Sequence, residues 1–206
     1  MLLFNYSTLV DPILKKVRIY VAELSDMKAG NRVLDVCCGT GDQVFYYVQR
    51  GATVTGIDQN PNMIELAENN RKRKGFNDVT FRLAAATDLP FPDGYFDCAS
   101  ISLGLHEMER GERDRAVSEM KRVVKKGGVL MFIDFQVPLP KNPIAYLIEA
   151  VEFLAGRDNY RCFRDYLAQG GLDHILKENQ LTQQKEALLK LANLQIIKST
   201  NPLLIA

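Results

Sequence analysis

The sequence predicts an α/β fold in which a doubly wound, mostly parallel sheet carries helices on both faces. Short apolar segments alternate with amphipathic segments between residues 32 and 135, as is typical of repeated strand–helix–strand units. A small-residue turn, Gly39-Thr40-Gly41, directly follows the first of the apolar segments. Polar residues follow several strands at the edge where such sheets bind ligands. We therefore expect a single domain over residues 1–206, with its ligand site at that edge.

The predicted elements follow in order along the chain. An N-terminal helical segment, about residues 1–29, contains an amphipathic helix over 9–27, because its apolar residues recur at helical spacing. Asn60 and Pro61 begin a later helix, as N-cap and first helical residue. The remaining elements of this part are a strand at 32–37, a helix at 42–50, strands at 52–58, 79–84 and 96–102, a helix at 113–124 and a strand at 129–135.

The alternation ends after residue 135, and prolines introduce a helical insertion at about 138–190 that we expect to cover the active site. A helical pattern resumes at 172–191, a sixth strand is expected at 194–198, and 203–206 reads as a very short final strand. One stripe of the insertion is expected to pack on the sheet rather than form a lid or a membrane-surface helix. It consists of Ile144, Leu147, Ile148, Val151 and Leu154.

Composition narrows the class of protein. The chain has 26 Lys and Arg against 25 Asp and Glu, so its global charge gives no reason to expect nucleic acid or an anionic membrane as partner. The basic run 71–74 ends a predicted helix and is interpreted as a solvated face. The four cysteines lack metal-ligand spacing and fit buried thiols in a reducing compartment. No segment resembles a signal peptide or a bilayer span, so we expect a cytoplasmic protein without a metal.

The charge around the glycine turn restricts its ligand. Asp35 and Asp42 flank the turn, and two carboxylates repel a bare pyrophosphate but not a cationic cofactor. Val44 occupies the position of the third glycine of a dinucleotide-binding turn, and no Gly-Lys-Ser/Thr follows for a Walker loop. An adenosine-type ligand remains, with its ribose hydroxyls bound by Asp58, about 20 residues after the turn. Taken alone, Asp58 could equally cap a helix or be solvated.

Four segments together resemble a known enzyme family. They are VLDVCCGTGDQ at 33–43, VTGIDQNPNMIELA at 54–67, AAATDLPFPDGYFDCASISLGLHE at 84–107 and VKKGGVLMFIDF at 124–135. In this order they are similar to the class I S-adenosylmethionine-dependent methyltransferases, above all to the ubiquinone/menaquinone-biosynthesis group. The resemblance implies a Rossmann-like fold and S-adenosylmethionine as cofactor, with S-adenosylhomocysteine as its product.

The resemblance also implies roles for individual residues. The cofactor's methionine end is assigned to the turn, its ribose to Asp58 and its adenine to the segments that follow the second and third strands. Two positions depart from the family pattern, since Cys37 stands where glycine is usual and Ala85 where aspartate is frequent. The implied cofactor residues are Asp35, Cys37, Gly39, Thr40, Gly41, Asp58, Gln59, Met63, Ala86, Thr87 and Ser102.

The acceptor side of the site is less constrained. Residues 102–106 are expected to face the sulfonium and the acceptor, and His106 is the candidate base if the acceptor loses a proton. A structural histidine held by hydrogen bonds is an equal alternative. Tyr160, Arg161 and Tyr166 are the candidate acceptor residues, because aromatic faces and fixed donors suit a small aromatic or polar molecule. Ordinary packing explains them equally well.

These observations predict a methyltransferase acting on a small molecule, either quinone-like or another aromatic or apolar compound, by C- or O-methylation. A nucleic-acid or protein methyltransferase and a non-catalytic S-adenosylmethionine-binding protein stay open as alternatives. No nucleic-acid partner is expected, and a peripheral membrane contact follows if the acceptor is a lipid quinone. A homodimer is left open.

Overall fold

The computed structural model describes residues 3–189 and 193–203. Its strands are β1 Arg32–Val36, β2 Thr53–Asp58, β3 Val79–Leu83, β4 Phe96–Ser102, β5 Val124–Phe135, β6 Gln183–Leu189 and β7 Leu194–Thr200. Its helices are α1 Leu3–Leu24, α2 Asp42–Val48, α3 Pro61–Lys74, α4 Arg110–Val123, α5 Pro143–Ala155, α6 Arg157–Gln169 and α7 Gly171–Glu178, and a 3₁₀ turn, η1, spans Leu105–Glu107.

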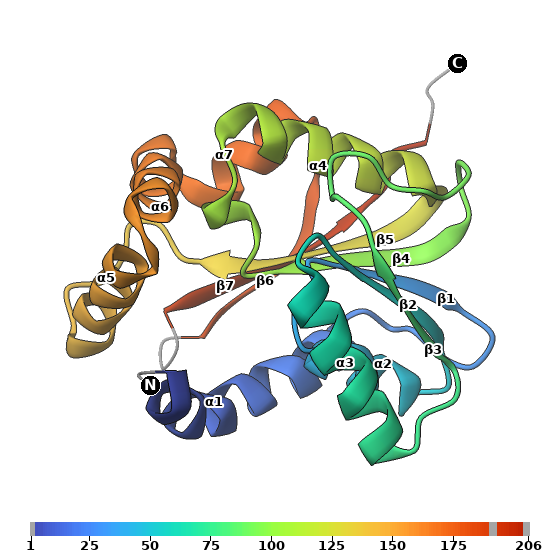
Figure 1. Ribbon diagram of the computed structural model, residues 1–206. Helices are drawn as coiled ribbons and strands as arrows, with labels where there is room; N and C mark the ends of the chain where they lie inside the picture. Colours follow the sequence, from blue (N-terminus) through green and yellow to red (C-terminus); the bar gives the residue numbers. More distant parts are fainter. Residues whose placement is uncertain (1–2, 190–192, 204–206) are drawn as a thin grey trace.

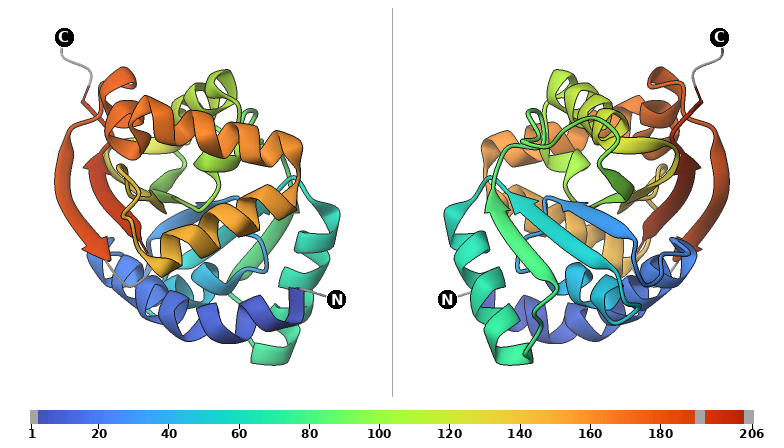
Figure 2. Two further views of the ribbon diagram at one scale, coloured as in Figure 1. Left: turned by 90° about the vertical axis from the view of Figure 1, so that its left-hand side faces the viewer. Right: turned by 90° about the vertical axis from the view of Figure 1, so that its right-hand side faces the viewer.

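All seven strands form one sheet in the order β3-β2-β1-β4-β5-β7-β6. Strands β1 to β5 are parallel to one another, whereas β7 is antiparallel to both β5 and β6. Helices α1, α2 and α3 cover one face, and α4 and α7 cover the other (Figures 1 and 2). The predicted doubly wound, mostly parallel α/β fold is therefore confirmed.

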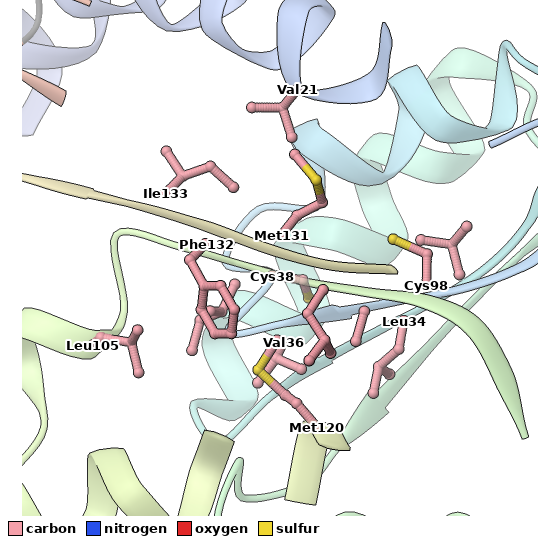
Figure 3. Close-up of a cluster of buried hydrophobic side chains, with 14 of the residues drawn as sticks. Val21, Leu34, Val36, Cys38, Cys98, Leu105, Met120, Met131, Phe132 and Ile133 are labelled. Carbon is pink, nitrogen blue, oxygen red and sulfur yellow. The ribbon is translucent and has the colours of Figure 1, made fainter. Parts of the chain in front are cut away.

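The core lies on both faces of the central strands. Successive residues of a strand point to opposite faces, so β5 supplies both layers. Figure 3 shows Met131 and Ile133 on the side of Val21 from α1, with Phe132 on the opposite side near Met120 of α4. All five side chains are at most 1% exposed. These apolar layers hold the strands rigidly, and so fix the positions of the turns that leave their carboxyl ends.

Helix α3 begins and ends as its sequence predicts. The Asn60 side chain accepts a hydrogen bond from the backbone N–H of Asn62 at 3.0 Å, Pro61 is the first helical residue, and Gly75 ends the helix with a left-handed backbone. The basic run 71–74 forms the last turn, where cations complement the helix dipole. Three of its four side chains are exposed, which confirms the solvated interpretation.

The helix predicted over 172–191 is wrong in its second half. Helix α7 ends at Glu178, and β6 then pairs antiparallel with β7 from Gln183 opposite Ser199 to Leu189 opposite Leu194. The segment has helical spacing and helix-forming residues, but strand pairing across a hairpin overrides that local preference. The expected sixth strand at 194–198 is confirmed as β7 and extends to Thr200.

The prediction for the apolar stripe of α5 is also wrong. Of its five residues only Ile148 is buried, while Leu147 is 51% and Leu154 74% exposed. Helix α5 packs against α6, beyond the end of the sheet, rather than on the sheet itself (Figure 1). A helical stripe identifies an apolar face but not the element that covers it.

Smaller differences concern element ends. Helix α1 spans 3–24 rather than 9–27, α4 starts three residues early, and β5 starts at Val124 rather than at residue 129. Asn201 explains the last difference, because its side-chain amide donates to the Val124 and Lys125 carbonyls and holds this early part of β5. Leu203 is not in a strand, and the rest of the predicted final strand, 204–206, lies outside the described residues.

Candidate functional site

A cavity of about 490 Å³ lies at the carboxyl ends of β1, β2 and β4. Its wall consists of the turns that follow β1 and β2, the loop that follows β4 and one side chain from α1. Parallel sheets bind ligands at this edge, so the cavity is where the topology predicts a site. Eight of the eleven expected cofactor residues line it, namely Asp35, Cys37, Gly39, Thr40, Asp58, Gln59, Met63 and Ser102.

The turn after β1 depends on left-handed backbone conformations. Cys37, Gly39 and Gly41 have φ angles of 56°, 52° and 77°. A side chain at Gly41 would put its Cβ only 2.5 Å from the Phe81 ring, so glycine is required there by packing as well as by conformation. Cys37 adopts the strained conformation without being glycine, and Gly104 from the β4 loop packs against its side chain. Thus the loop after β4 is held against the turn.

The Asp58 carboxylate is fixed at the end of β2 by two backbone amides. The N–H of Gly39 donates to Oδ2 and the N–H of Asn60 donates to Oδ1, both at 2.9 Å. Each carboxylate oxygen keeps further lone-pair capacity, which can accept hydrogen bonds from ligand hydroxyls. A fixed acceptor beside a glycine turn is suited to a ribose diol.

Asp35 is an ionisable group in a nearly dry part of the cavity wall. It is 2% exposed, and Ser100 donates a hydrogen bond to its Oδ1 at 2.6 Å. Burial raises the pKa of Asp35 to about 7, and the Ser100 hydrogen bond and the Arg18 charge only partly oppose this. Near neutral pH this carboxyl therefore exists in both protonation states.

The cavity has an excess of acidic groups. Four carboxylates line it, from Asp35, Asp42, Asp58 and Glu107, against one guanidinium, from Arg18. Arg18 lies 3.7 Å from Asp42, so part of its charge is already paired. Such a wall favours a cationic ligand and disfavours a pyrophosphate. The excess of acidic groups at the turn thus extends over the whole cavity.

Three expected cofactor residues do not line the cavity. Gly41 packs against Phe81, Ala86 is buried and Thr87 is half-buried. Gly41 is the last residue of the turn, whereas Ala86 and Thr87 follow β3. Ala85 is half-buried there and presents only a methyl group, so it brings no carboxylate to this part of the site.

His106 is a buried, doubly paired residue. It is 2% exposed, with Nδ1 2.6 Å from Asp134 Oδ1 and Nε2 3.6 Å from Glu152 Oε1. Burial alone would lower its pKa, but the Asp134 and Glu152 carboxylates raise it to about 10. A protonated imidazole between two carboxylates cannot accept a proton at neutral pH. The two contacts favour the structural alternative, and the role of His106 as a base stays a prediction.

The three expected acceptor residues lie away from the cavity. Tyr166 is fully buried and donates its hydroxyl to the Phe135 carbonyl at 2.9 Å. Arg161 is 65% exposed and paired with Glu109, and Tyr160 is half-buried on α6. Of their two interpretations, the structure favours packing and surface pairing over acceptor binding.

Sequence reasoning missed two charged residues of the wall. Arg18 is on α1, and its carbonyl accepts a hydrogen bond from Gln43 Nε2 at 3.2 Å, which ties that helix to the turn. Glu107 ends η1, and its pKa is raised by desolvation, against the effect of His106. Glu107 could have been found from its place directly after the β4 loop, whereas nothing local distinguishes Arg18 from the other cations of its helix.

Within residues 3–189 and 193–203, no group of three or more His, Cys, Asp or Glu side chains is arranged to hold a metal ion. No helix in the same residues is both long and apolar enough to cross a membrane.

Comparison with known proteins extends these observations. Residues 33–128 match a protein family described as methyltransferase domain. The chain is 38% identical over 138 residues to the ubiquinone/menaquinone biosynthesis C-methyltransferase UbiE of Pseudomonas aeruginosa, a match that covers 65% of this chain and 53% of that protein. It is also 38% identical over 109 residues to an uncharacterized methyltransferase of Synechocystis, covering 53% and 49%. The chain thus spans about half the length of the curated relatives it matches.

Solved structures resemble this fold over most of its length. The YcgJ protein of Bacillus subtilis aligns with a TM-score of 0.68 at 18% identity and covers 91% of this chain and 99% of its own. The geranyl diphosphate C-methyltransferase of Streptomyces coelicolor, solved with Mg²⁺, geranyl diphosphate and S-adenosylhomocysteine, has a TM-score of 0.67 at 14% identity, covering 93% and 81%. At such identities the likeness is one of fold.

Proposed function

We propose that this chain carries a class I S-adenosylmethionine-dependent methyltransferase domain and that it methylates a carbon or oxygen atom of a small aromatic or quinone-like acceptor. The main support is the cavity at the ends of β1, β2 and β4. Eight expected cofactor residues line it, and its acidic side chains outnumber its basic ones. The UbiE relatives favour C-methylation of a quinone precursor, but they share only about half their length with this chain.

The residues present fit S-adenosylmethionine. Asp58, held by two backbone amides, would accept hydrogen bonds from the ribose hydroxyls, and the acidic wall around Asp35 would attract the positively charged methionine end. When bound, this cofactor supplies a methyl group already activated on a positively charged sulfur. The protein's main task is then to align the acceptor, since in-line transfer needs geometry more than acid or base chemistry.

A proton must leave if the acceptor is a phenol or an activated carbon. Glu107 is the candidate to receive it, because its carboxylate lines the cavity and its raised pKa makes it a better base than an ordinary glutamate. His106 would act as a positioning residue, since its contact with Asp134 at the end of β5 holds η1, and so Glu107, in place. The cytoplasm stays the proposed location, supported by four free thiols.

The cofactor part of the proposal is tested by titration calorimetry with S-adenosylmethionine and S-adenosylhomocysteine. We expect saturable binding, and at least a tenfold loss in Asp58→Asn, because the fixed hydroxyl acceptor loses its charge and one lone-pair set. Asp78→Asn is the matched control, an exposed aspartate outside the cavity, and should bind as the wild type does. Absence of heat with both ligands would overturn the proposal.

The acceptor part is tested with a labelled methyl group and fractionated cell extract. Label should enter the organic-solvent fraction, and treatment of the extract with nuclease or protease should leave that signal unchanged. Label in nucleic acid or protein would favour the other transferase classes. Cofactor binding without label in any fraction would favour a non-catalytic binding protein.

A further inference from the structure

The outward face of α5 is apolar along its whole length. Tyr146, Leu147, Phe153 and Leu154 are 63%, 51%, 67% and 74% exposed, and every other exposed residue of the helix is alanine or proline. These positions follow helical spacing, so the large side chains form one stripe on one side of the helix. Large apolar side chains gathered on one exposed helix face are a feature of interaction surfaces.

The charged residues of α5 point elsewhere. Glu152 is buried and faces His106, and Glu149 pairs with Arg164 of α6 at 3.4 Å. The stripe is also anchored to the fold, because the Phe153 ring packs edge-on against Tyr160 with 5.4 Å between the ring centroids. The apolar face is therefore a defined surface of a helix that is fixed to its neighbours.

Cations border this face. Lys141 precedes α5 and Arg157 follows it, and α6 continues the series with Arg161 and Arg164, all four of them exposed. Arg161 pairs with Glu109 and Asp158, but in the part of the chain that the structure describes no acid lies within ion-pair distance of Lys141 or Arg157. In the left panel of Figure 2, α5 and α6 cross the front of the molecule side by side above α1, on one face.

We infer that α5 and the outward side of α6 dock on an anionic lipid surface. The apolar face of α5 enters the boundary between headgroups and acyl chains, and Lys141 and Arg157 contact the headgroup phosphates. An amphipathic helix with aromatic and aliphatic residues on one face and flanking cations has the chemistry of interfacial membrane helices. The docked surface spans residues 141–164, which are described throughout.

A second copy of the chain suits this face less well. A 13-residue helix, about 20 Å long and 10 Å wide, presents about 200 Å². A stable protein interface buries about 800 Å² on each partner. The flanking cations also oppose self-association, since a symmetric contact would bring like charges together.

The inference extends the proposed function, because an apolar acceptor would be concentrated in the surface to which the protein docks. Helix α5 is joined to the site through Glu152 and His106, and the residue after His106, Glu107, lines the cavity. The docking test uses neither cofactor nor acceptor. Its failure is therefore distinguishable from a failure of methyl transfer.

The test is co-sedimentation of the full chain with vesicles of phosphatidylcholine alone or mixed with phosphatidylglycerol. We expect binding to the mixed vesicles that weakens with added salt. The double variant Phe153→Ser/Leu154→Ser should lose roughly tenfold or more in bound fraction, from the apolar surface it removes. Lys141→Glu/Arg157→Glu should lose the preference for the anionic vesicles.

The matched control is Leu66→Ser/Leu83→Ser, which removes two exposed leucines on α3 and β3 and should bind vesicles as the wild type does. Circular dichroism melts of every variant exclude unfolding as a cause of lost binding. The inference fails if the wild type stays in the supernatant with anionic vesicles, or if the control loses binding equally. It also fails if sedimentation equilibrium finds a dimer that Phe153→Ser/Leu154→Ser dissociates while vesicles bind neither form.

Discussion

At the cavity, the fold sets the protonation state of Asp35 by burying its carboxyl group. It is nearly inaccessible to water, Ser100 is its hydrogen-bond donor, and burial brings its pKa to about 7. A cationic ligand in the cavity stabilises the ionised form, so ligand binding and proton release at Asp35 are linked.

The first prediction follows from that linkage. Affinity for S-adenosylmethionine should rise by at most about tenfold per pH unit up to about pH 7. Above that pH it should level off. Titration calorimetry across this range measures the slope. Asp35→Asn should bind more weakly and lose the pH dependence; an unchanged slope in that variant would assign the titration to another group.

A second prediction separates two glycines of the same turn. Gly39→Ala places a Cβ in open space, so only the left-handed backbone conformation is unfavourable. We expect this substitution to lower the free energy of unfolding by about 1 kcal/mol. Gly41→Ala adds a contact of 2.5 Å with the Phe81 ring and should cost about 3 kcal/mol or more. Urea denaturation compares them, and equal losses would contradict the packing role of Gly41.

At the scale of elements, α5 carries two glutamates that pair with other elements, one buried and one near the surface. Glu152 faces the His106 imidazolium at 3.6 Å, whereas Glu149 meets Arg164 near the surface. Removing a carboxylate from a buried ion pair leaves an uncompensated charge, and removing one at the surface leaves a solvated one.

The third prediction uses this matched pair of glutamates. Glu152→Gln should lower the free energy of unfolding by about 2 kcal/mol, since His106 keeps only Asp134 as its counter-charge. Glu149→Gln should change it by no more than about 0.5 kcal/mol. Chemical denaturation measures both, and similar values would show that Glu152 does not stabilise the imidazolium.

The elements also show where sequence reasoning succeeds and where it fails. The strands β1 to β4 and the start of α3 are set by local signals, an apolar run or the Asn60-Pro61 cap, and they lie where predicted. Strand β6 is set by its partner β7 across a hairpin, and the exposed face of α5 by the absence of a covering element; neither is encoded in local spacing. The cavity residues at the strand ends could be predicted because local signals set those strands. The burial of His106 and Tyr166 depends on tertiary packing and could not be predicted from local spacing.

For the whole molecule, two buried groups set the direction of its pH stability. Unfolded, His106 titrates near 6.5 and Asp35 near 3.8; folded, their pKa values are about 10 and about 7. Both bind the proton more tightly when folded. Their contributions are therefore fully present below the unfolded pKa and are lost as pH rises through the folded one.

The fourth prediction is that the melting temperature of the cofactor-free protein falls as pH rises from about 6.5 to about 10, through His106. Between about 4 and 7 Asp35 adds a further decline, and Asp35→Asn should remove that part alone. Differential scanning fluorimetry over this range measures both. A melting temperature that increases up to pH 10 would contradict the protonated state of His106.

The place of β7 between β5 and β6 has a consequence for how this chain is made on the ribosome. The other six strands are synthesised before β7. Strand β6 nevertheless cannot join the sheet until β7 has emerged, because among the described strands it pairs with β7 alone. Until then the β5 edge, from Val129 to Phe135, presents unpaired backbone and apolar side chains to other nascent chains. In the period between the emergence of β5 and that of residue 200, this unpaired edge is therefore open to strand pairing with other chains.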